Sequence, residues 1–381
     1  MRNFIRLHDS RVVRPALLAV SAVAAIATIG GTAGTAAGYG TASARHAHHH
    51  ASQLRKEAGL SDAHLAHGEL AIEGTNAGDR LALRLQSGNP AILQVDVGDD
   101  GSADFRFARA EIAKISVNGE NGDDAVRIDE SNGVFTDTIP TTVDGGNGDD
   151  NLVGGAGGVT LDGGNGNDTL AGGPGAETLL GGNGSDSVDG NGGNDVAVLG
   201  NGNDTFVWDP GDGSDIVEGQ NGTDTMLFNG AGGPEQVDLS ANGSRLRFFR
   251  TQGNITMDTA GVERVDFNAL GGADLATVND LSGTDVVSVN IDLAGTLGGS
   301  NGDGAADRVV VNGTNGDDAI RVDGDAGAAK VSGLAATVNV LHPEVASDRL
   351  EINTLAGKDN VDAGGLAAGV IKLFADGVPL P

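Results

Sequence analysis

Between Gly145 and Leu227 the apolar and polar positions of the chain repeat every nine residues. Nine segments share one frame, in which small residues occupy positions 1, 2 and 4, an acid usually occupies position 6, and an apolar residue occupies position 8. The position-8 residues are Leu152, Leu161, Leu170, Leu179, Val188, Ala197, Phe206, Val217 and Met226. One apolar side chain in every nine predicts short strands that each turn one residue inward, so that stacked strands bury only a thin core.

The loops between these strands offer oxygen donors, because each carries backbone carbonyls and most carry an aspartate at position 6. Glycine supplies the positive φ that lets one loop lie close to the next, at a cost in backbone entropy. Calcium takes about six to eight oxygen ligands in forgiving geometry, whereas magnesium needs a strict octahedron and zinc prefers nitrogen and sulfur. The chain has no Cys, and residues 145–227 contain no His. Calcium is therefore the metal that fits, and the alternative is a metal-free glycine-rich solenoid whose aspartates cap turns.

This pattern resembles the glycine- and aspartate-rich nonapeptide of the haemolysin-type, or RTX (repeats-in-toxin), calcium-binding family. The resemblance covers residues 145–227 and implies a parallel β-roll in which two nonapeptides complete one turn. Residues eighteen positions apart would then stack, with a two-residue insertion at Trp208 and Asp209. One ladder contains Asp150, Asp168, Asp186, Asp204 and Asp224, and the opposite ladder contains Val159, Glu177, Asp195 and Asp215.

The seven aspartates of the two ladders are the expected calcium ligands. Val159 has no oxygen donor in its side chain, and Glu177 is one methylene longer than aspartate. The opposite ladder is therefore expected to be poor in calcium near its start and to bind it at Asp195 and Asp215.

The segments on both sides of the repeats are β-rich. Short apolar runs between Gly, Asn and Asp residues predict strands at 81–85, 92–97, 105–107, 115–117 and 126–128, and again at 262–267, 286–293, 309–311, 320–322, 338–341 and 350–352. Gly74–Asp79, Gly119–Asp124 and Gly313–Asp318 look like isolated turns of the repeat, the first two out of frame with Gly145. The predicted fold class is all-β, with a β-roll or β-solenoid at 145–227 between irregular β modules at 69–144 and 228–381. The second module fits either an irregular solenoid or a β-sandwich.

Composition supports a metal-dependent fold. The 381 residues carry 53 acids against 23 bases, a formal charge of −30, and aromatic residues make up only 3%. Such a charge would repel nucleic acids and anionic membranes. Self-repulsion and low hydrophobicity predict a repeat region that is largely disordered without a stoichiometric cation. With no cysteine to form disulfides, calcium is the expected substitute.

The N-terminal segment has the features of a secretory signal over residues 1–44. Four arginines precede an apolar run over 16–29, and Ala42-Ser43-Ala44 provides a cleavage site. The run is short for a membrane span, although a retained anchor is the alternative. Residues 45–68 carry six of the eight histidines. We interpret them as a polar linker with a short helix near 53–58, the alternative being a metal-capture site. The mature protein is expected to be extracellular, without a membrane span.

No catalytic signature stands out. A zinc-protease HExxH motif is missing, because no His is followed by Glu. Gly298–Gly302 matches the letters of GxSxG, but turn residues follow where the nucleophile elbow needs a helix. The sequence therefore predicts a secreted calcium-binding repeat protein that is not an enzyme, with a structural or cell-surface adhesive role. The alternative is an RTX-type secreted hydrolase or toxin with an unrecognised catalytic region. A protein or glycan partner is not identified.

Overall fold

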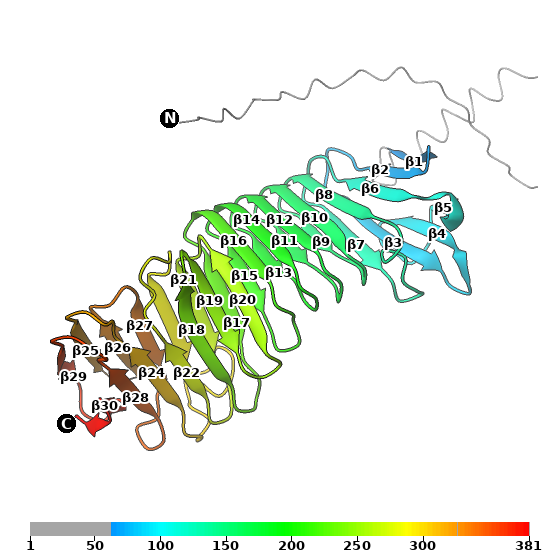
Figure 1. Ribbon diagram of the computed structural model, residues 1–381. Helices are drawn as coiled ribbons and strands as arrows, with labels where there is room; N and C mark the ends of the chain where they lie inside the picture. Colours follow the sequence, from blue (N-terminus) through cyan, green and yellow to red (C-terminus); the bar gives the residue numbers. More distant parts are fainter. Residues whose placement is uncertain (1–61, 326, 381) are drawn as a thin grey trace, which may run out of the picture. The chain divides into compact units, whose positions relative to one another are not determined.

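The computed structural model describes residues 62–325 and 327–380, which alternate between two β-sheets (Figure 1). The predicted signal segment, the helix near 53–58 and four of the linker histidines lie outside the described residues. Within the described residues the only helical segment is a 3₁₀ turn, η1 (Arg109–Glu111). That part of the chain thus contains no helix with the length and apolar character needed to cross a membrane.

The first sheet has 16 strands in the described residues. In spatial order they are β1 (Asp62–Ala66), β2 (Glu69–Glu73), β6 (Lys114–Asn118), β8 (Thr141–Asn147), β10 (Val159–Asn165), β12 (Thr178–Asn183), β14 (Val196–Gly202), β16 (Ile216–Gly222), β20 (Ile255–Ala260), β19 (Arg245–Arg250), β18 (Gln236–Asn242), β22 (Leu275–Val278), β24 (Arg308–Asn312), β28 (Arg349–Asn353), β30 (Lys372–Ala375) and β31 (Val378–Pro379).

The second sheet has 15 strands in the same described residues. In spatial order they are β29 (Asn360–Leu366), β25 (Ala319–Asp325), β26 (Ala328–Ser332), β27 (Thr337–Leu341), β23 (Ser288–Asp292), β21 (Arg264–Asn268), β17 (Thr225–Asn229), β15 (Thr205–Trp208), β13 (Ser187–Asp189), β11 (Thr169–Ala171), β9 (Asn151–Val153), β7 (Ala125–Asp129), β3 (Arg80–Gln86), β4 (Asn89–Val97) and β5 (Phe105–Ala108).

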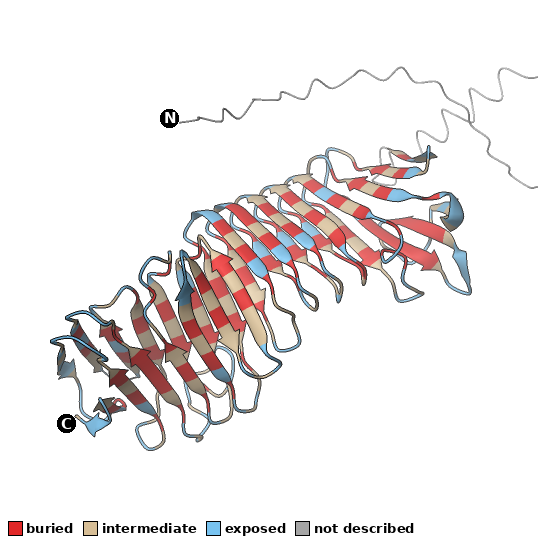
Figure 2. Cartoon of the chain, viewed as in Figure 1, coloured by how far each residue is buried: buried red, intermediate tan, exposed pale blue. Residues whose placement is uncertain are grey.

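In the repeats, consecutive nonapeptides contribute strands to alternate sheets, so two nonapeptides make one coil. Leu161 on β10 pairs in parallel with Leu179 on β12, eighteen residues later, and Leu170 on β11 pairs with Val188 on β13. All nine position-8 side chains are completely buried between the sheets. Buried and half-buried residues alternate along the strands (Figure 2), which is the period of a strand with one face on the core. The predicted β-roll fold class is confirmed.

The segment before the repeats uses the same two sheets. β2 and β6 are parallel neighbours that lead directly into β8, and β3 and β7 lead into β9. The antiparallel strands β3, β4 and β5 end the second sheet, and β1 pairs antiparallel with β2. β1 lies within the segment that we predicted as linker, so that prediction is wrong for these residues. Ala63 is buried against the core there, which gives this short strand an apolar anchor.

The segment after the repeats also stays in the two sheets, as an irregular solenoid and not as a separate sandwich. β17 continues in parallel to β21 and β23, while β22 continues to β24 and β28. Antiparallel meanders are inserted at β18–β20 and at β25–β27. Next to the first meander, Trp208 and Phe228 pack with their ring centroids 4.4 Å apart, and Phe248 and Phe267 extend the aromatic cluster. The core is therefore thin in the repeats and thicker just beyond them.

Candidate metal site

The loops that join the two sheets form two rows of corners. At first-side corners the chain passes from the first sheet to the second, and at second-side corners it passes back. A typical first-side corner is Gly163–Asp168, in which position 2 (Gly164) and position 4 (Gly166) have φ of 97° and 133°. A Cβ on Gly166 would lie 1.8 Å from the carbonyl oxygen of Gly148 in the preceding coil. Only glycine allows corners to stack this closely.

The position-6 aspartates of the first side form one continuous ladder. The Oδ1 atom of Asp168 accepts a 2.8 Å hydrogen bond from the backbone N–H of Asp150, and Asp186 accepts one of 2.8 Å from Asp168. The same bond, at 2.8 Å and 2.9 Å, joins Asp186 to Asp204 and Asp204 to Asp224. These aspartates are at most 2% exposed. The ladder predicted from the eighteen-residue spacing is therefore present, and it uses one oxygen of each carboxylate.

The second oxygen of each of these carboxylates is buried and accepts no hydrogen bond. This holds for Oδ2 of Asp150, Asp168, Asp186, Asp204 and Asp224. At position 1, a Cβ on Gly145 would lie 2.2 Å from Asp150 Oδ2 and 2.8 Å from the Gly163 carbonyl oxygen of the next coil. The missing side chain thus leaves a space where a carboxylate and a carbonyl oxygen meet. A buried carboxylate without a partner is costly, so this donor set fits a bound cation.

Burial also shifts the titration of the ladder. It raises the pKa of Asp168 to about 6 and that of Asp186 to about 6, although the backbone N–H of the preceding aspartate lowers each pKa. On the second side, burial raises the pKa of Asp215 to about 7. Neighbouring carboxylates raise these values further. A positive charge beside these groups would favour their ionised form.

The second side is less regular, as its sequence suggested. Asp195 Oδ1 accepts a hydrogen bond of 2.8 Å from Glu177 N–H, Asp215 Oδ1 accepts one of 2.8 Å from Asp195 N–H, and the Oδ2 atoms of both aspartates are unpartnered. Glu177 accepts a 3.1 Å bond from Gly173 N–H of its own corner, but its Oε1 atom is unpartnered. Val159 is buried and supplies no side-chain oxygen. Whether calcium is scarce at this end stays a prediction.

The first-side ladder begins earlier than we predicted. Asp124 N–H donates to Asp150 Oδ1 at 2.7 Å, Asp124 Oδ2 is buried without a partner, and its corner has the same positive φ at Glu120 and Gly122. The sequence pattern identified Gly119–Asp124 as an isolated turn of the repeat but did not predict that Asp124 belongs to the first-side ladder. The reason is that 26 residues separate Asp124 from Asp150, instead of eighteen. The extra length is the loop between β7 and β8. At the other end, Glu263 Oε2 accepts the N–H of Asp224 at 2.7 Å.

Side chains alone do not enclose a metal in this structure. Within residues 62–325 and 327–380, no three His, Asp or Glu side chains converge as a ligand group. A cation at a corner would therefore take most of its ligands from backbone carbonyls, with one or two carboxylates. Calcium accepts such mixed oxygen sets, including carbonyls.

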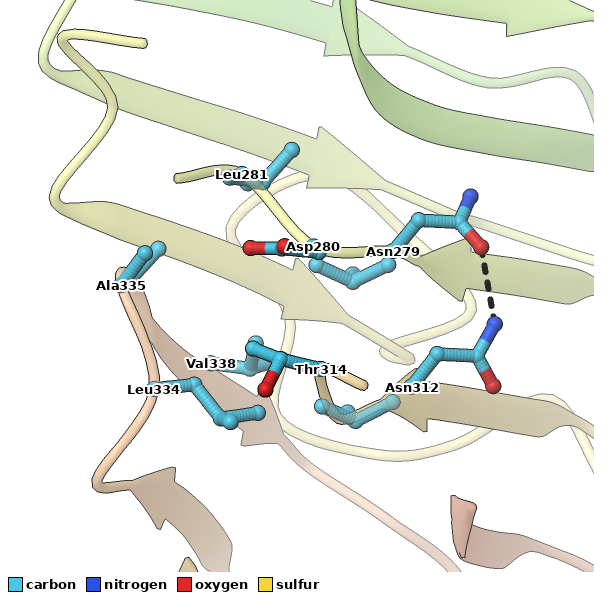
Figure 3. Close-up of a pocket in the computed structure, with 11 residues that line it drawn as sticks. Asn279, Asp280, Leu281, Asn312, Thr314, Leu334, Ala335 and Val338 are labelled. Carbon is cyan, nitrogen blue, oxygen red and sulfur yellow. Dashed lines mark hydrogen bonds between the residues drawn. The ribbon is translucent and has the colours of Figure 1, made fainter. Parts of the chain in front are cut away.

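Three cavities of the described residues range in volume from about 10 Å³ to about 380 Å³. One of about 10 Å³ lies between the corners after β22 and β24 and the turn that follows β26, with room for about one water molecule. Asn312 Nδ2 donates to Asn279 Oδ1 at 2.8 Å along its rim (Figure 3). Recesses of about 210 Å³ and 380 Å³ lie beside Arg127 and Leu373. Gly298–Gly302 lies in the loop between β23 and β24 and is not followed by a helix.

Stacked glycine corners that bury a ladder of aspartates between two parallel sheets define a cation-binding β-roll. The comparison with protein families agrees with this class. The model of the RTX calcium-binding nonapeptide repeat (4 copies) matches residues 144–176, 172–206 and 211–230. These segments are therefore RTX-type calcium-binding repeats, and such repeats bind Ca²⁺. No curated protein matches the chain.

Proposed function

We propose that this is a secreted protein whose β-roll folds when Ca²⁺ binds between stacked corners, and that it serves a structural or cell-surface adhesive role. The observation that carries the proposal is the row of buried carboxylate oxygens without hydrogen-bond donors. The proposed ligands are corner carbonyls and the side chains of Asp150, Asp168, Asp186, Asp195, Asp204, Asp215 and Asp224. We add Asp124, because its Oδ2 atom is also buried without a partner and its corner has positive φ at the same two positions.

The signal-like N-terminal sequence supports the secreted location, as do the matched repeats, because proteins with these repeats are typically secreted. Extracellular calcium-binding modules have Kd values on the order of 10⁻⁴–10⁻³ M, so the roll would form after export. A structural role suits a chain whose described residues form two continuous sheets. Hydrolase assays on the full chain with calcium present distinguish this role from the alternative of a secreted hydrolase or toxin.

Counting bound calcium by equilibrium dialysis tests the ligand assignment. Asp168→Asn and Asp195→Asn should each bind less calcium than the parent chain, because each removes the charge of an unpartnered carboxylate. Asp79→Asn is the matched control, since both Asp79 oxygens already accept hydrogen bonds from Thr75, at 2.6 Å and 3.2 Å. Full calcium binding by both Asp168→Asn and Asp195→Asn would contradict the assignment.

A further inference from the structure

Two kinds of corner occur among the described residues, and the backbone conformation at position 2 distinguishes them. In closed corners the position-2 N–H donates to the position-6 carboxylate of the same corner. Thr75 donates to Asp79 at 2.6 Å, and Thr314 donates to Asp318 at 2.7 Å. In open corners position 2 has a left-handed φ, as at Gly164 (97°), and one oxygen of the aspartate, here Asp168, is left without a donor. Asp79 and Asp318 have both carboxylate oxygens satisfied within their own closed corners, whereas the unpartnered oxygen of an open corner needs an external cation.

Two open corners lie outside the segments matched by the repeat family: Gly119–Asp124, described above, and the second-side corner Ala269–Asp274, between β21 and β22. Leu270 and Gly272, at positions 2 and 4, have φ of 66° and 116°. Asp274 is 4% exposed, and its Oδ2 atom is buried without a hydrogen-bond partner. This is the combination found in the repeat corners.

The left-handed leucine supports a functional interpretation. Leucine rarely adopts positive φ, and such conformations persist where the surrounding structure enforces them. Four other residues with side chains take this conformation at position 2: Glu120, Asn191, Gln220 and Leu355. The first three are each followed by an aspartate with a buried, unpartnered oxygen, namely Asp124, Asp195 and Asp224, whereas Asp359, which follows Leu355, is only half-buried. Position 2 of an open corner therefore keeps its conformation when it is not glycine.

The surroundings of Asp274 are acidic. Its Oδ1 atom accepts the Glu235 N–H at 2.6 Å, and its own N–H donates to Asp307 Oδ1 at 2.9 Å. Asp303 Oδ2 accepts the N–H of Gly272 at 2.6 Å. In the preceding coil, Arg250 neutralises Glu235 through two hydrogen bonds of 2.7 Å. Among the described residues Asp274 has no such basic partner, so its charge is uncompensated.

We propose that the corner Ala269–Asp274 is a further Ca²⁺ site, held by Asp274 Oδ2 and by corner carbonyls and flanked by the carboxylates of Asp303 and Asp307. The inference rests on the proposed function, because it applies the chemistry of the repeat corners to a corner that lacks the repeat sequence. All donors are oxygens, which favours calcium over zinc, and the irregular corner disfavours the octahedron of magnesium. The nonapeptide pattern does not include this corner, because alanine stands at position 1 and leucine at position 2.

Equilibrium dialysis of the full chain against Ca²⁺ tests the proposal. Asp274→Asn should bind one calcium ion fewer than the parent chain, while Asp318→Asn, at a closed corner, should bind the same number. Leu270→Thr should also lose one ion, because threonine disfavours positive φ and occupies position 2 of two closed corners. Leu270→Gly should keep the ion, since glycine adopts positive φ without strain.

The outcomes separate this proposal from the proposed function. Unchanged calcium stoichiometry in both Asp274→Asn and Leu270→Thr overturns the proposed site while the repeat sites stand. Absence of calcium binding by the parent chain overturns the function itself. If Asp274→Asn does not fold, the Leu270→Thr and Leu270→Gly pair decides, because Leu270 is only half-buried and neither variant removes a charge.

Discussion

Removing calcium with EDTA near neutral pH should unfold the repeat coils of the purified chain. Among residues 62–325 and 327–380, ten carboxylate oxygens are buried without a hydrogen-bond donor, those of Asp124, Asp150, Asp168, Glu177, Asp186, Asp195, Asp204, Asp215, Asp224 and Asp274. A buried polar atom left unsatisfied costs about 1–3 kcal/mol. Ten of them together cost about 10–30 kcal/mol, against a total stability of about 5–15 kcal/mol for an ordinary domain. Without a cation the folded repeats should therefore not persist.

Far-ultraviolet circular dichroism and Trp208 fluorescence measure this transition together. Trp208 is completely buried, and its indole N–H donates to the Gly213 carbonyl at 3.0 Å, so unfolding exposes it to water. Excess Ca²⁺ should restore both signals, whereas excess Mg²⁺ should not, because it requires a stricter octahedron of ligands. Identical spectra and identical thermal midpoints in EDTA and in calcium would refute the reasoning.

Two further predictions concern pH and glycine. Burial raises the pKa of Asp168 and Asp186 from 3.8 to about 6. Protonation of these carboxyls therefore stabilises the calcium-free fold, and this stabilisation is complete below pH 3.8 and is lost as the pH rises through about 6. In EDTA, circular dichroism should therefore show more β-structure near pH 4 than near pH 7; a flat profile contradicts this. Gly166→Ala should lower the thermal midpoint in calcium far more than Gly232→Ala, because its Cβ meets the Gly148 carbonyl at 1.8 Å, whereas no atom lies within 4 Å at Gly232.

The sequence predicted the repeat region well because its signal is local and periodic. The apolar residue at position 8 and the acid at position 6 recur at fixed spacing, so a parallel coil of two nonapeptides places Leu161 beside Leu179 and Asp150 beside Asp168. It also predicted strands on both sides of the repeats from their apolar runs. The predicted linker was too long, because a strand of only five residues such as β1 depends on its partner β2 and has little sequence signal of its own.

What the sequence alone determined, then, is the all-β class, the oxygen-rich corners and the two ladders, because these follow from residue types at a fixed spacing. Tertiary structure alone decided how far the ladders extend and which carboxylates lack a partner. Asp124 joins the first ladder across a longer loop, Asp318 is satisfied by Thr314, and Asp274 is left open beside a left-handed leucine. Backbone conformation at position 2 sets the direction of an N–H group, and stacking sets which oxygens are buried. The spacing of residue types along the sequence determines neither the direction of the N–H group nor the burial of the oxygens.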